Sequence, residues 1–376
     1  MADRILVTGG AGFIGRHLAH ALLRRGYHVR VLDNLIEQVH GSRPVVGTRD
    51  ADGEIDLVIG DVRDDAVVGR ALRGIDMVVH LAAEVGVGQS MYAVDRYVSV
   101  NDHGTAVLFQ HLIAAPVRRV VVASSMSIYG EGLYRDAEGR VVAQAARLPR
   151  SGAAHGSAWD PLDEQGRPLT PIPTPEWKQP ALASVYAISK FVQERLTLTL
   201  APAYGMEGVA LRLWNAYGPG QALSNPYTGV LAIFASRLLN GQRPLVFEDG
   251  NQRRDFVHVE DVAAAFVLAL EHPRAPGGVF NIASGEDRSV RDVAMLLASA
   301  MERPNLAPEI TGQARAGDVR HCIPDLTLAR EVLGYAPRRA FTDGLRELSD
   351  WVARQRAAED RVQQARQELE ARGLVA

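Results

Sequence analysis

Short apolar runs rich in β-branched residues alternate along the chain with longer segments that carry apolar residues at helical spacing. The runs are residues 5–7, 28–32, 57–59, 77–79 and 120–123, and the helical segments between them include 13–23 and 67–72. Strands that alternate with helices at this spacing form right-handed crossovers. The pattern therefore predicts an α/β fold, a Rossmann-type doubly wound parallel sheet with helices on both faces.

Two stretches interrupt this alternation and suggest how the chain divides into domains. Residues 131–183 are polar and rich in Gly, Pro and Ala, and the elements become mixed from about residue 218. We expect a Rossmann domain over 1–217, with the loop 131–183 inserted near its active site. A smaller mixed α/β lobe, mainly for substrate binding, is expected over 218–345, with some segments returning to the first domain. Apolar residues at three- and four-residue steps predict a C-terminal amphipathic helix over 346–376.

Composition narrows the classes of function. The 376 residues are 47% hydrophobic and 23% charged, with a net charge of −3, which gives no electrostatic footprint for nucleic acid or an anionic membrane. The apolar run 262–270 is too short to span a bilayer. A single cysteine, Cys322, allows neither an internal disulfide nor a cysteine-based zinc site, and we expect no metal. The chain is strand-like from residue 4, so we expect no signal peptide and a cytoplasmic protein.

A glycine-rich motif joins the first strand to the first helix. Gly9 permits a tight turn, Gly12 lets the backbone approach a pyrophosphate, and Gly15 lets helix and strand pack closely. The helix N-terminus offers free N–H groups to the anion. Asp33, eighteen positions beyond Gly15, can bind the adenosine ribose hydroxyls and would repel a 2′-phosphate. No Arg or Lys immediately flanks Asp33, so the sequence predicts NAD rather than NADP; a plain tight turn is the alternative.

A second motif provides acid–base chemistry. Tyr186 and Lys190 lie four residues apart, on one face of the helix predicted over 184–200. A free tyrosine, with a pKa near 10, is too weakly acidic to act as a base at neutral pH. A neighbouring ammonium and the positive nicotinamide would favour the phenolate and lower that pKa. The pair therefore predicts proton removal from an alcohol during hydride transfer, although such a pair alone is also common on helix surfaces.

Together these motifs resemble the extended short-chain dehydrogenases, the NAD-dependent epimerase/dehydratase family of UDP-galactose 4-epimerase and dTDP-glucose 4,6-dehydratase. The resemblance covers roughly residues 3–345 and includes the segments 60–62, 80–83, 122–130, 212–219, 250–261 and 317–320. It implies an NAD-dependent enzyme that acts on a nucleotide-diphosphate sugar, with no nucleic-acid or membrane partner, and a homodimer.

The resemblance also implies the site residues. The catalytic set is Ser125, Tyr186 and Lys190. The cofactor-binding set is Gly9, Gly12, Phe13, Ile14, Gly15, Asp33, Asn34, Asp61, Val62, Leu81, Ala82, Ala83, Asn101, Ser124, Tyr186 and Lys190. The substrate-binding set is Val85, Ser125, Ser127, Tyr186, Asn215, Phe247, Arg254 and Arg320. The Ser125 hydroxyl would polarise the substrate oxygen, and the two arginines would hold the pyrophosphate, with surface ion pairing as their alternative role.

The residues after Ser125 favour one reaction of this family. Related 4,6-dehydratases carry Asp-Glu there, a UDP-glucuronate decarboxylase would carry glutamate at position 127, and the GDP-fucose synthase type uses cysteine. This chain has Met126 and Ser127. The remaining groups suffice to oxidise C4, let the ketone reorient and return hydride to its other face, which is a 4-epimerase.

Further stretches are similar to dTDP-L-rhamnose 4-epimerase-type proteins, namely 39–40, 84–92, 125–132, 173–176 and 224–229. Trp214 and Gly220 depart from the pattern, so another hexose or a heptose stays open. A 4-keto-sugar reductase is an alternative, which Asp33 disfavours because dedicated reductases usually use NADPH. A dinucleotide-sensing regulator is the non-enzyme alternative, and it would not need the catalytic set.

The inserted loop leads to a further hypothesis. Ser125 and Tyr186 lie 61 positions apart, farther than is common in the family, yet both must reach one substrate oxygen. The ends of the loop are therefore pinned beside the active site. We expect the residues before Glu176 to form a wall or lid that helps select the sugar; a solvated insertion without a role is the alternative.

Overall fold

The computed structural model describes residues 2–41, 49–50, 53–145, 147, 159–227, 229–355 and 362–375. An eight-stranded sheet forms its centre, in the order β14 (Val279–Ile282), β10 (Glu207–Leu213), β6 (Arg119–Ser125), β5 (Met77–His80), β1 (Arg4–Thr8), β2 (His28–Asp33), β4 (Gly53–Ile59) and β3 (Arg49–Asp50). All neighbours pair in parallel except β3, which is antiparallel to β4. The sheet confirms the predicted Rossmann-type fold.

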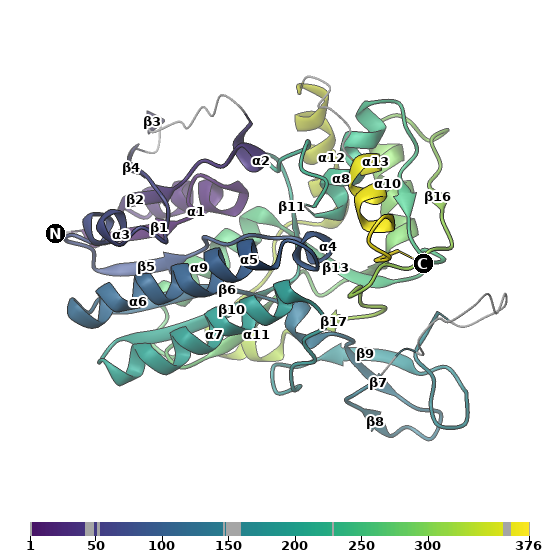
Figure 1. The fold of residues 1–376 in the computed structure, drawn as a ribbon, viewed down its shortest axis with the longest axis horizontal. Coiled ribbons are helices and arrows are strands. Elements are labelled where there is room, and N and C mark those ends of the chain that lie inside the picture. Colours follow the sequence, from purple (N-terminus) through teal and green to yellow (C-terminus); the bar gives the residue numbers. More distant parts are fainter. Residues whose placement is uncertain are drawn as a thin grey trace.

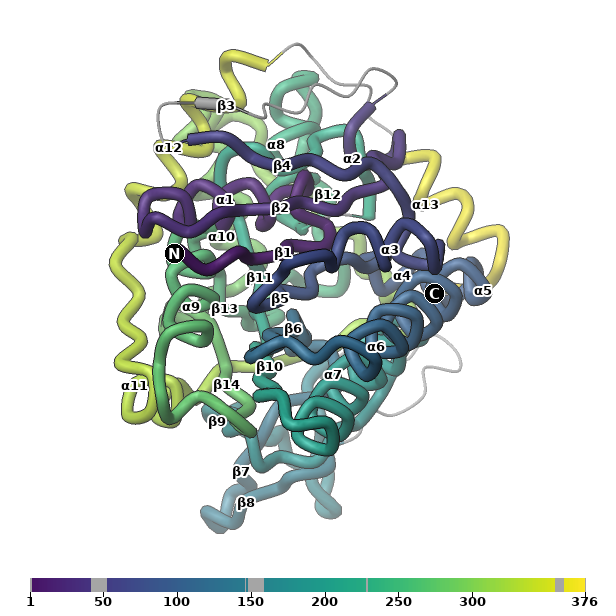
Figure 2. The backbone as a smooth tube through the Cα atoms, turned by 90° about the vertical axis from the view of Figure 1, so that its left-hand side faces the viewer, coloured from purple at the N-terminus to yellow at the C-terminus, as the bar shows by residue number. Residues whose placement is uncertain are grey.

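Side chains that alternate along the strands build a core on each face of this sheet. Ile5 and Val7 pack with α1 (Phe13–Arg24), α9 (Val259–Glu271) and α11 (Thr327–Leu333). Leu6, between them, packs on the other face with α3 (Asp65–Ala71) and α6 (Gly104–Ala114), and α7 (Val185–Ala203) covers the same face. Figure 2 shows α1 and α9 on one side of the strands and α3, α6 and α7 on the other. The two-residue period of a strand thus supplies both layers.

The strand order reverses at β1, which has β2 on one side and β5 on the other. In an open α/β sheet, the crevice for a ligand forms at such a reversal, beyond the carboxyl ends of the strands. Short elements surround this edge: α2 (Glu37–His40), α4 (Val87–Ser90), α5 (Val94–Tyr97), the π-helical turn η1 (Val98–His103) and the 3₁₀ turn η2 (Met126–Tyr129).

A smaller mixed lobe lies at the same end of the sheet (Figure 1). Its core packs α8 (Val230–Leu239), α10 (Val290–Ala300) and α12 (Phe341–Ala353) together. Its strands form two small sheets, β11 (Asn215–Tyr217) with β13 (Arg253–His258) and β15 (Asp287–Ser289), and β12 (Leu245–Val246) with β16 (Glu309–Ile310). Between these elements, α9 and β14 return to the large sheet.

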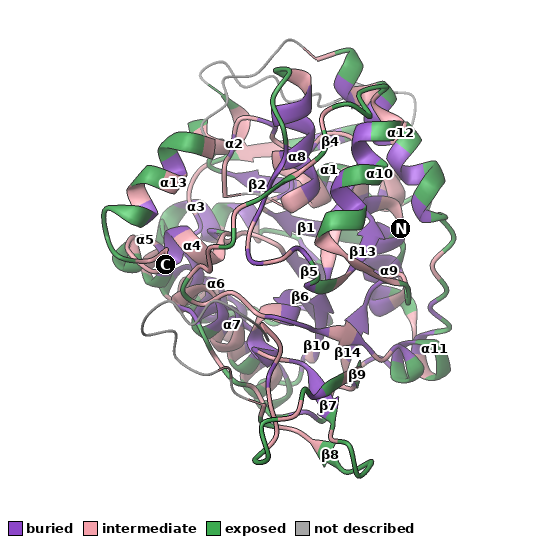
Figure 3. Ribbon diagram, turned by 90° about the vertical axis from the view of Figure 1, so that its right-hand side faces the viewer, coloured by how far each residue is buried: buried purple, intermediate pink, exposed green. Residues whose placement is uncertain are grey.

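The described part of the inserted loop folds into a sheet of its own. Its strands are β8 (Val141–Val142), β7 (Leu133–Arg135) and β9 (Thr170–Thr174), joined by β17 (Ile323–Pro324), which precedes α11 in the chain. This sheet projects from the main body, and its tip around β8 is exposed (Figure 3). The segment that is expected to be a loop therefore has regular structure, because β7 pairs with β8 and β9 inside the insertion and β17 extends the sheet.

The described residues of the C-terminal region form two helices where the sequence predicts one. The first, α12, begins at Phe341 and buries Leu345, Leu348 and Val352 in the smaller lobe. The second, α13 (Val362–Glu370), buries Ala365 and Leu369 instead. Among the described residues, no helix has the length and apolar composition needed to cross a bilayer.

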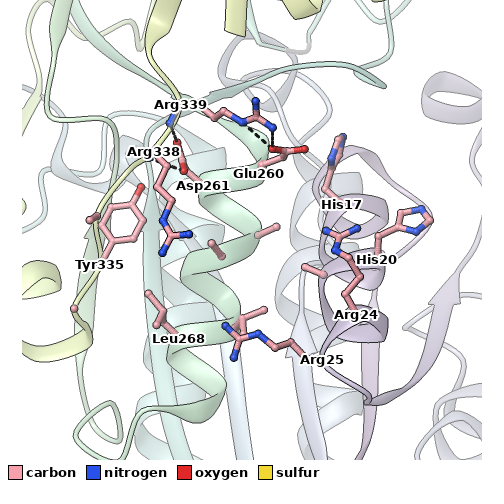
Figure 4. Close-up of a pocket in the computed structure, with 16 residues that line it drawn as sticks. His17, His20, Arg24, Arg25, Glu260, Asp261, Leu268, Tyr335, Arg338 and Arg339 are labelled. Atoms are coloured by element: carbon pink, nitrogen blue, oxygen red, sulfur yellow. Dashed lines mark hydrogen bonds and ion pairs between the residues drawn. The ribbon is translucent and has the colours of Figure 1, made fainter. Parts of the chain in front are cut away.

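A cavity of about 660 Å³ lies between α1, α9 and residues 334–339 (Figure 4). Its carboxylates are already satisfied: Glu260 pairs with Arg339, and Asp261 accepts from the backbone N–H groups of Arg338 and Arg339. None of the described residues that line it belongs to a predicted site.

Candidate active site

The turn after β1 requires glycine at the positions that the motif predicts. Gly9 has φ +68°, and a Cβ there would lie 2.8 Å from the backbone nitrogen of Ala82. A Cβ at Gly15 would lie 2.5 Å from the Cα of Gly10, so α1 can pack this closely only without a side chain. At Gly12, just before α1, the nearest atom to an added Cβ is the Gly9 oxygen at 3.2 Å, and the space beyond is open. The arrangement fits a pyrophosphate over the helix N-terminus.

Asp33 ends β2 beside this turn, and the backbone fixes its carboxylate. Oδ2 accepts a hydrogen bond from the N–H of Ala11 at 3.0 Å, and Oδ1 accepts one from Leu35 at 2.9 Å. The side chain is buried, with His40 Nε2 at 3.5 Å. A carboxylate held at this place suits the ribose hydroxyls of NAD and disfavours the added phosphate of NADP.

A cleft of about 590 Å³ extends from the glycine turn to the smaller lobe. The predicted cofactor residues on its wall are Gly9, Gly12, Phe13, Ile14, Gly15, Asp33, Asn34, Val62, Leu81, Ala82, Ala83, Ser124, Tyr186 and Lys190. The predicted substrate residues on its wall are Val85, Ser125, Ser127, Tyr186, Asn215, Phe247 and Arg254. The fold thus brings together residues spread over nearly 250 positions.

Two predicted cofactor residues do not line this cleft. Asn101, fully buried in η1, accepts from the Glu84 N–H at 2.7 Å and donates to the Glu84 carbonyl at 3.1 Å. Asp61 accepts hydrogen bonds from Asn34 and Arg63, and the bond from Arg63 lowers its pKa to about 2. Asn101 and Asp61 both support their neighbours on the wall. Burial of Asn101 corrects the prediction that it contacts the cofactor directly, whereas that contact stays a prediction for Asp61.

Arg320 requires a larger correction. Its side chain is 1% exposed and pairs with Asp160, Glu248 and Asp249 at 2.6–2.9 Å. Asp160 belongs to the inserted segment, so this arginine holds the insertion to the smaller lobe. It does not line the cleft. A sequence motif cannot reveal this, because the competing carboxylates come from distant parts of the chain.

Arg315, in the same segment, lines the cleft instead. Its guanidinium carbon lies 4.4 Å from the centre of the Phe247 ring, a cation–π arrangement. Arg254 is held by the carbonyls of Arg253, Val319 and Arg320. Arg254 and Arg315 therefore both line the cleft, and Arg315 takes the place that was predicted for Arg320.

The described residues of the insertion contribute nothing to the wall. The cleft lining passes from Ser127 to Ser184, and the described residues 131–145, 147 and 159–183 are all absent from it. The described part of the insertion therefore does not support the hypothesis of a wall or lid over the sugar. Residues 148–158 lie outside the described residues.

Gln252 is a cleft residue that the sequence did not single out. Its amide donates to the Phe247 carbonyl at 2.8 Å, and its buried Oε1 has no hydrogen-bond partner among the described residues. A buried acceptor without a partner costs about 1–3 kcal/mol, so a bound ligand that donates to it would recover that energy.

The three predicted catalytic residues meet at the carboxyl end of β6. Ser125 ends this strand, and its Oγ accepts from the Ser127 N–H at 3.1 Å. Tyr186 and Lys190 come from the first turns of α7, which begins where the Ser184 hydroxyl caps the Ala187 N–H. Burial raises the pKa of Tyr186, and its hydrogen bond with Ser125 acts in the opposite direction. The pKa of Tyr186 is therefore raised in this structure. The lowered pKa that the sequence predicts applies to the site with the nicotinamide bound.

Lys190 points into a buried polar network instead of bonding to Tyr186. Its Nζ donates to Gln193 Oε1 at 2.5 Å, and burial lowers the pKa of Lys190 to about 7, against the raising effect of Glu194. The Gln193 amide contacts Thr105 Oγ1 at 3.0 Å and His80 Nε2 at 3.1 Å. Gln193 follows Lys190 by one helical turn, a spacing that could have suggested the contact.

The fold and the site define a dinucleotide-binding enzyme of the extended short-chain dehydrogenase class, with serine, tyrosine and lysine beside a glycine-rich turn. The profile of the NAD dependent epimerase/dehydratase family matches residues 5–147 and 164–283, and the chain belongs to this family. It is an NAD-dependent enzyme of the sugar nucleotide epimerase class.

Individual relatives cover nearly the whole chain. A dTDP-L-rhamnose 4-epimerase from Burkholderia thailandensis is 35% identical over 359 residues, which are 94% of this chain and 95% of the relative. The UDP-glucose 4-epimerase of Thermus thermophilus, solved with NAD, has a TM-score of 0.70 and 31% identity, covering 93% of this chain and 99% of that one. The UDP-glucose 4-epimerase of Thermotoga maritima, solved with UDP-glucose, has a TM-score of 0.73 and 29% identity, covering 93% and 98%.

Proposed function

We propose that this protein is a nucleotide-sugar 4-epimerase that acts on dTDP-L-rhamnose or on a related NDP-hexose or NDP-heptose. The observation that carries the proposal is the meeting of Ser125, Tyr186 and Lys190 on one cleft with the glycine turn. The similarity to the Burkholderia thailandensis enzyme supports this choice of substrate.

The chain's own residues supply the proton chemistry. NAD, when bound, supplies a reversible hydride acceptor. Tyr186 takes the proton from the C4 hydroxyl, and Ser125 donates a hydrogen bond to the same oxygen. Lys190, as an ammonium, stabilises the tyrosine anion. The oxidised sugar turns its other face before the hydride and the proton return, so the cycle begins and ends with the same oxidation state.

The surroundings of Ser125 favour epimerisation over the related reactions. Met126 and Ser127 carry no carboxyl group, so the Asp-Glu pair with which related 4,6-dehydratases remove water is missing there. The GDP-fucose synthase type uses a cysteine. Cys322 is buried, and burial raises its pKa to about 12, which disfavours a thiolate for that reaction.

The far end of the cleft suits a nucleoside diphosphate. Arg254 and Arg315 present guanidinium groups, and Phe247 offers an aromatic face. Guanidinium groups bind phosphate with charge-assisted hydrogen bonds, and aromatic rings stack on bases. The homodimer stays a prediction from the family resemblance, and the cytoplasmic location stays a prediction from the sequence.

The proposal is tested with purified protein, NAD and a panel of NDP-sugars, with products identified by NMR. We expect dTDP-L-rhamnose or a related sugar to reach equilibrium with its C4 epimer without net NADH formation. Activity on a 4-keto sugar alone, with stoichiometric consumption of a reduced cofactor, would assign a reductase instead. Inversion at a different carbon would contradict the assignment to C4.

A further inference from the structure

The C-terminal helix α13 lies on the cleft, although no predicted site residue belongs to it. Val362, Ala365, Arg366 and Leu369 are part of the cleft wall. Leu369 is 5% exposed, and a Cβ added at Gly88 of α4 would lie 3.4 Å from its Cδ1. Figure 3 shows α13 on the same side of the molecule as α4. The helix therefore completes a cleft that the Rossmann domain and the smaller lobe begin.

A pair of tyrosines fixes α13 to both sides of the cleft. Oε2 of Glu368 lies 3.0 Å from the hydroxyl oxygens of Tyr92 and Tyr227, which are themselves 2.5 Å apart. Tyr92 follows α4 at the edge of the Rossmann domain, whereas Tyr227 precedes α8 of the smaller lobe. The Arg372 guanidinium carbon lies 4.4 Å from the centre of the Tyr92 ring. One carboxylate thus connects three segments that are remote in sequence.

The cleft-lining arginine of α13 lies near the end of the cleft that carries Phe247 and Arg315. Arg366 Nη2 donates to Gln313 Oε1 at 2.8 Å, and its Nε pairs with Glu370 at 2.8 Å. These two bonds use two of the five N–H donors of a guanidinium. The backbone adds a contact in the same region, where the Ala316 N–H donates to the Leu374 carbonyl at 2.9 Å.

Three arginines therefore line the substrate side of the cleft, Arg254, Arg315 and Arg366. We propose that α13 is part of the substrate site, with Arg366 binding the diphosphate of the nucleotide sugar and Leu369 closing the cleft beside Gly88. Glu368 is a positioning residue, because its contacts with the two tyrosines anchor α13, the helix that carries Arg366. This inference rests on the proposed nucleotide-sugar substrate.

The test uses full-length variants, with dTDP and UDP as probes in calorimetric titrations of the NAD-saturated protein. Arg366→Gln should raise the Kd for the nucleoside diphosphate about tenfold, as expected for the loss of a charge-assisted hydrogen bond. Glu368→Ala should raise it by a smaller factor, because the helix is loosened and the arginine stays. Gln367→Ala, on the exposed side of the same helix, is the matched control and should leave the Kd unchanged.

A second readout separates binding from misfolding. The Kd for NAD should stay close to that of the wild type in all three variants, because α13 contributes no residue to the glycine turn. The Tm should stay close to that of the wild type in Arg366→Gln and Gln367→Ala. With an active sugar, Arg366→Gln should raise KM and leave kcat nearly unchanged. Unchanged KM and Kd values in Arg366→Gln would overturn the inference, even in an active epimerase.

The outcomes also distinguish this inference from the proposed function. Wild-type protein that binds dTDP or UDP without epimerising any sugar would overturn the proposed function, while a raised Kd in Arg366→Gln would still support the role of α13. Failure of the wild type to bind any nucleoside diphosphate would overturn both.

Discussion

Gln193 should set the pH at which kcat/KM falls on the alkaline side, because it contacts the Lys190 ammonium. Its Oε1 accepts the hydrogen bond of the Lys190 ammonium at 2.5 Å, and Lys190 is only 3% exposed. Gln193→Met keeps a side chain of similar length and removes this acceptor. The buried ammonium then loses a stabilising contact, whereas the neutral amine loses little.

The magnitude follows from the energy of that bond. A hydrogen bond to a charged group contributes about 1.5–3 kcal/mol, which corresponds to roughly 1–2 pKa units. Burial already lowers the pKa of Lys190 to about 7, so Gln193→Met should bring it to between about 5 and 6. At neutral pH the variant would hold a neutral lysine, which cannot stabilise the Tyr186 phenolate.

The assay is the pH dependence of kcat/KM, measured with NAD-saturated enzyme and an active sugar. The ammonium is the working form and is lost as the pH rises through the pKa of Lys190. The alkaline limb should therefore move to lower pH by roughly 1–2 units in Gln193→Met. Gln193→Glu is the matched variant: its carboxylate favours the ammonium and should move the limb to higher pH.

Two results would refute this reasoning. The first is an alkaline limb at the same pH in both variants, which would show that Lys190 does not control it. The second is a shift in the same direction for Met and Glu, since the two side chains act oppositely on an ammonium. The NAD affinity and the Tm of each variant show whether the fold is retained.

Further predictions concern the cofactor, the base, the ion-pair cluster and acid stability. Asp33→Ala should reduce the preference for NAD over NADP by about 1–3 kcal/mol in calorimetric titrations; equal affinities in the wild type would contradict the role of Asp33. Tyr186→Phe should keep NAD binding and lower kcat by roughly 10²–10⁴-fold, and near wild-type turnover would exclude Tyr186 as the base. Arg320→Met should cost about 3 kcal/mol in denaturant titrations while the Kd for dTDP changes little, whereas Arg315→Met should weaken dTDP binding; the reverse pattern would restore Arg320 to the substrate site. Burial lowers the pKa of His80 to about 3. Between about pH 3 and 6.5 the unfolded state therefore binds more protons than the folded state. The free energy of unfolding should fall by up to ~1.4 kcal/mol per pH unit on acidification through that range. His80→Asn should give a flatter dependence, and an identical slope would exclude His80 as its source.

The parts of the site that could be predicted from sequence are those formed by a single short segment of the chain. The glycine turn is such a case, because Gly9 needs its positive φ and Gly15 its close contact within one strand–helix junction. Tyr186 and Lys190 are another, since helical geometry alone puts both on one face. The alternation of β-branched runs with helical segments likewise reflects the periods of strand and helix.

Contacts between distant segments could not be predicted in the same way. Arg315 and Arg320 occupy one short segment, but Arg320 is buried in ion pairs with Asp160, Glu248 and Asp249, whereas Arg315 lines the cleft. The sheet of the insertion is extended by β17, nearly 150 positions after β9. The place of α13 depends on the tyrosines that meet at Glu368.

By itself the sequence determined the fold class, the cofactor cradle and the catalytic pair, because hydrophobic period, glycine conformation and helical spacing are properties of neighbouring residues. The tertiary structure decided which arginines face the cleft, which acceptor Lys190 finds and what covers the substrate side. Charged side chains are long and can pair with any opposite charge within reach. Their roles are therefore set by which partners the folded chain brings near them and how far those partners are removed from water.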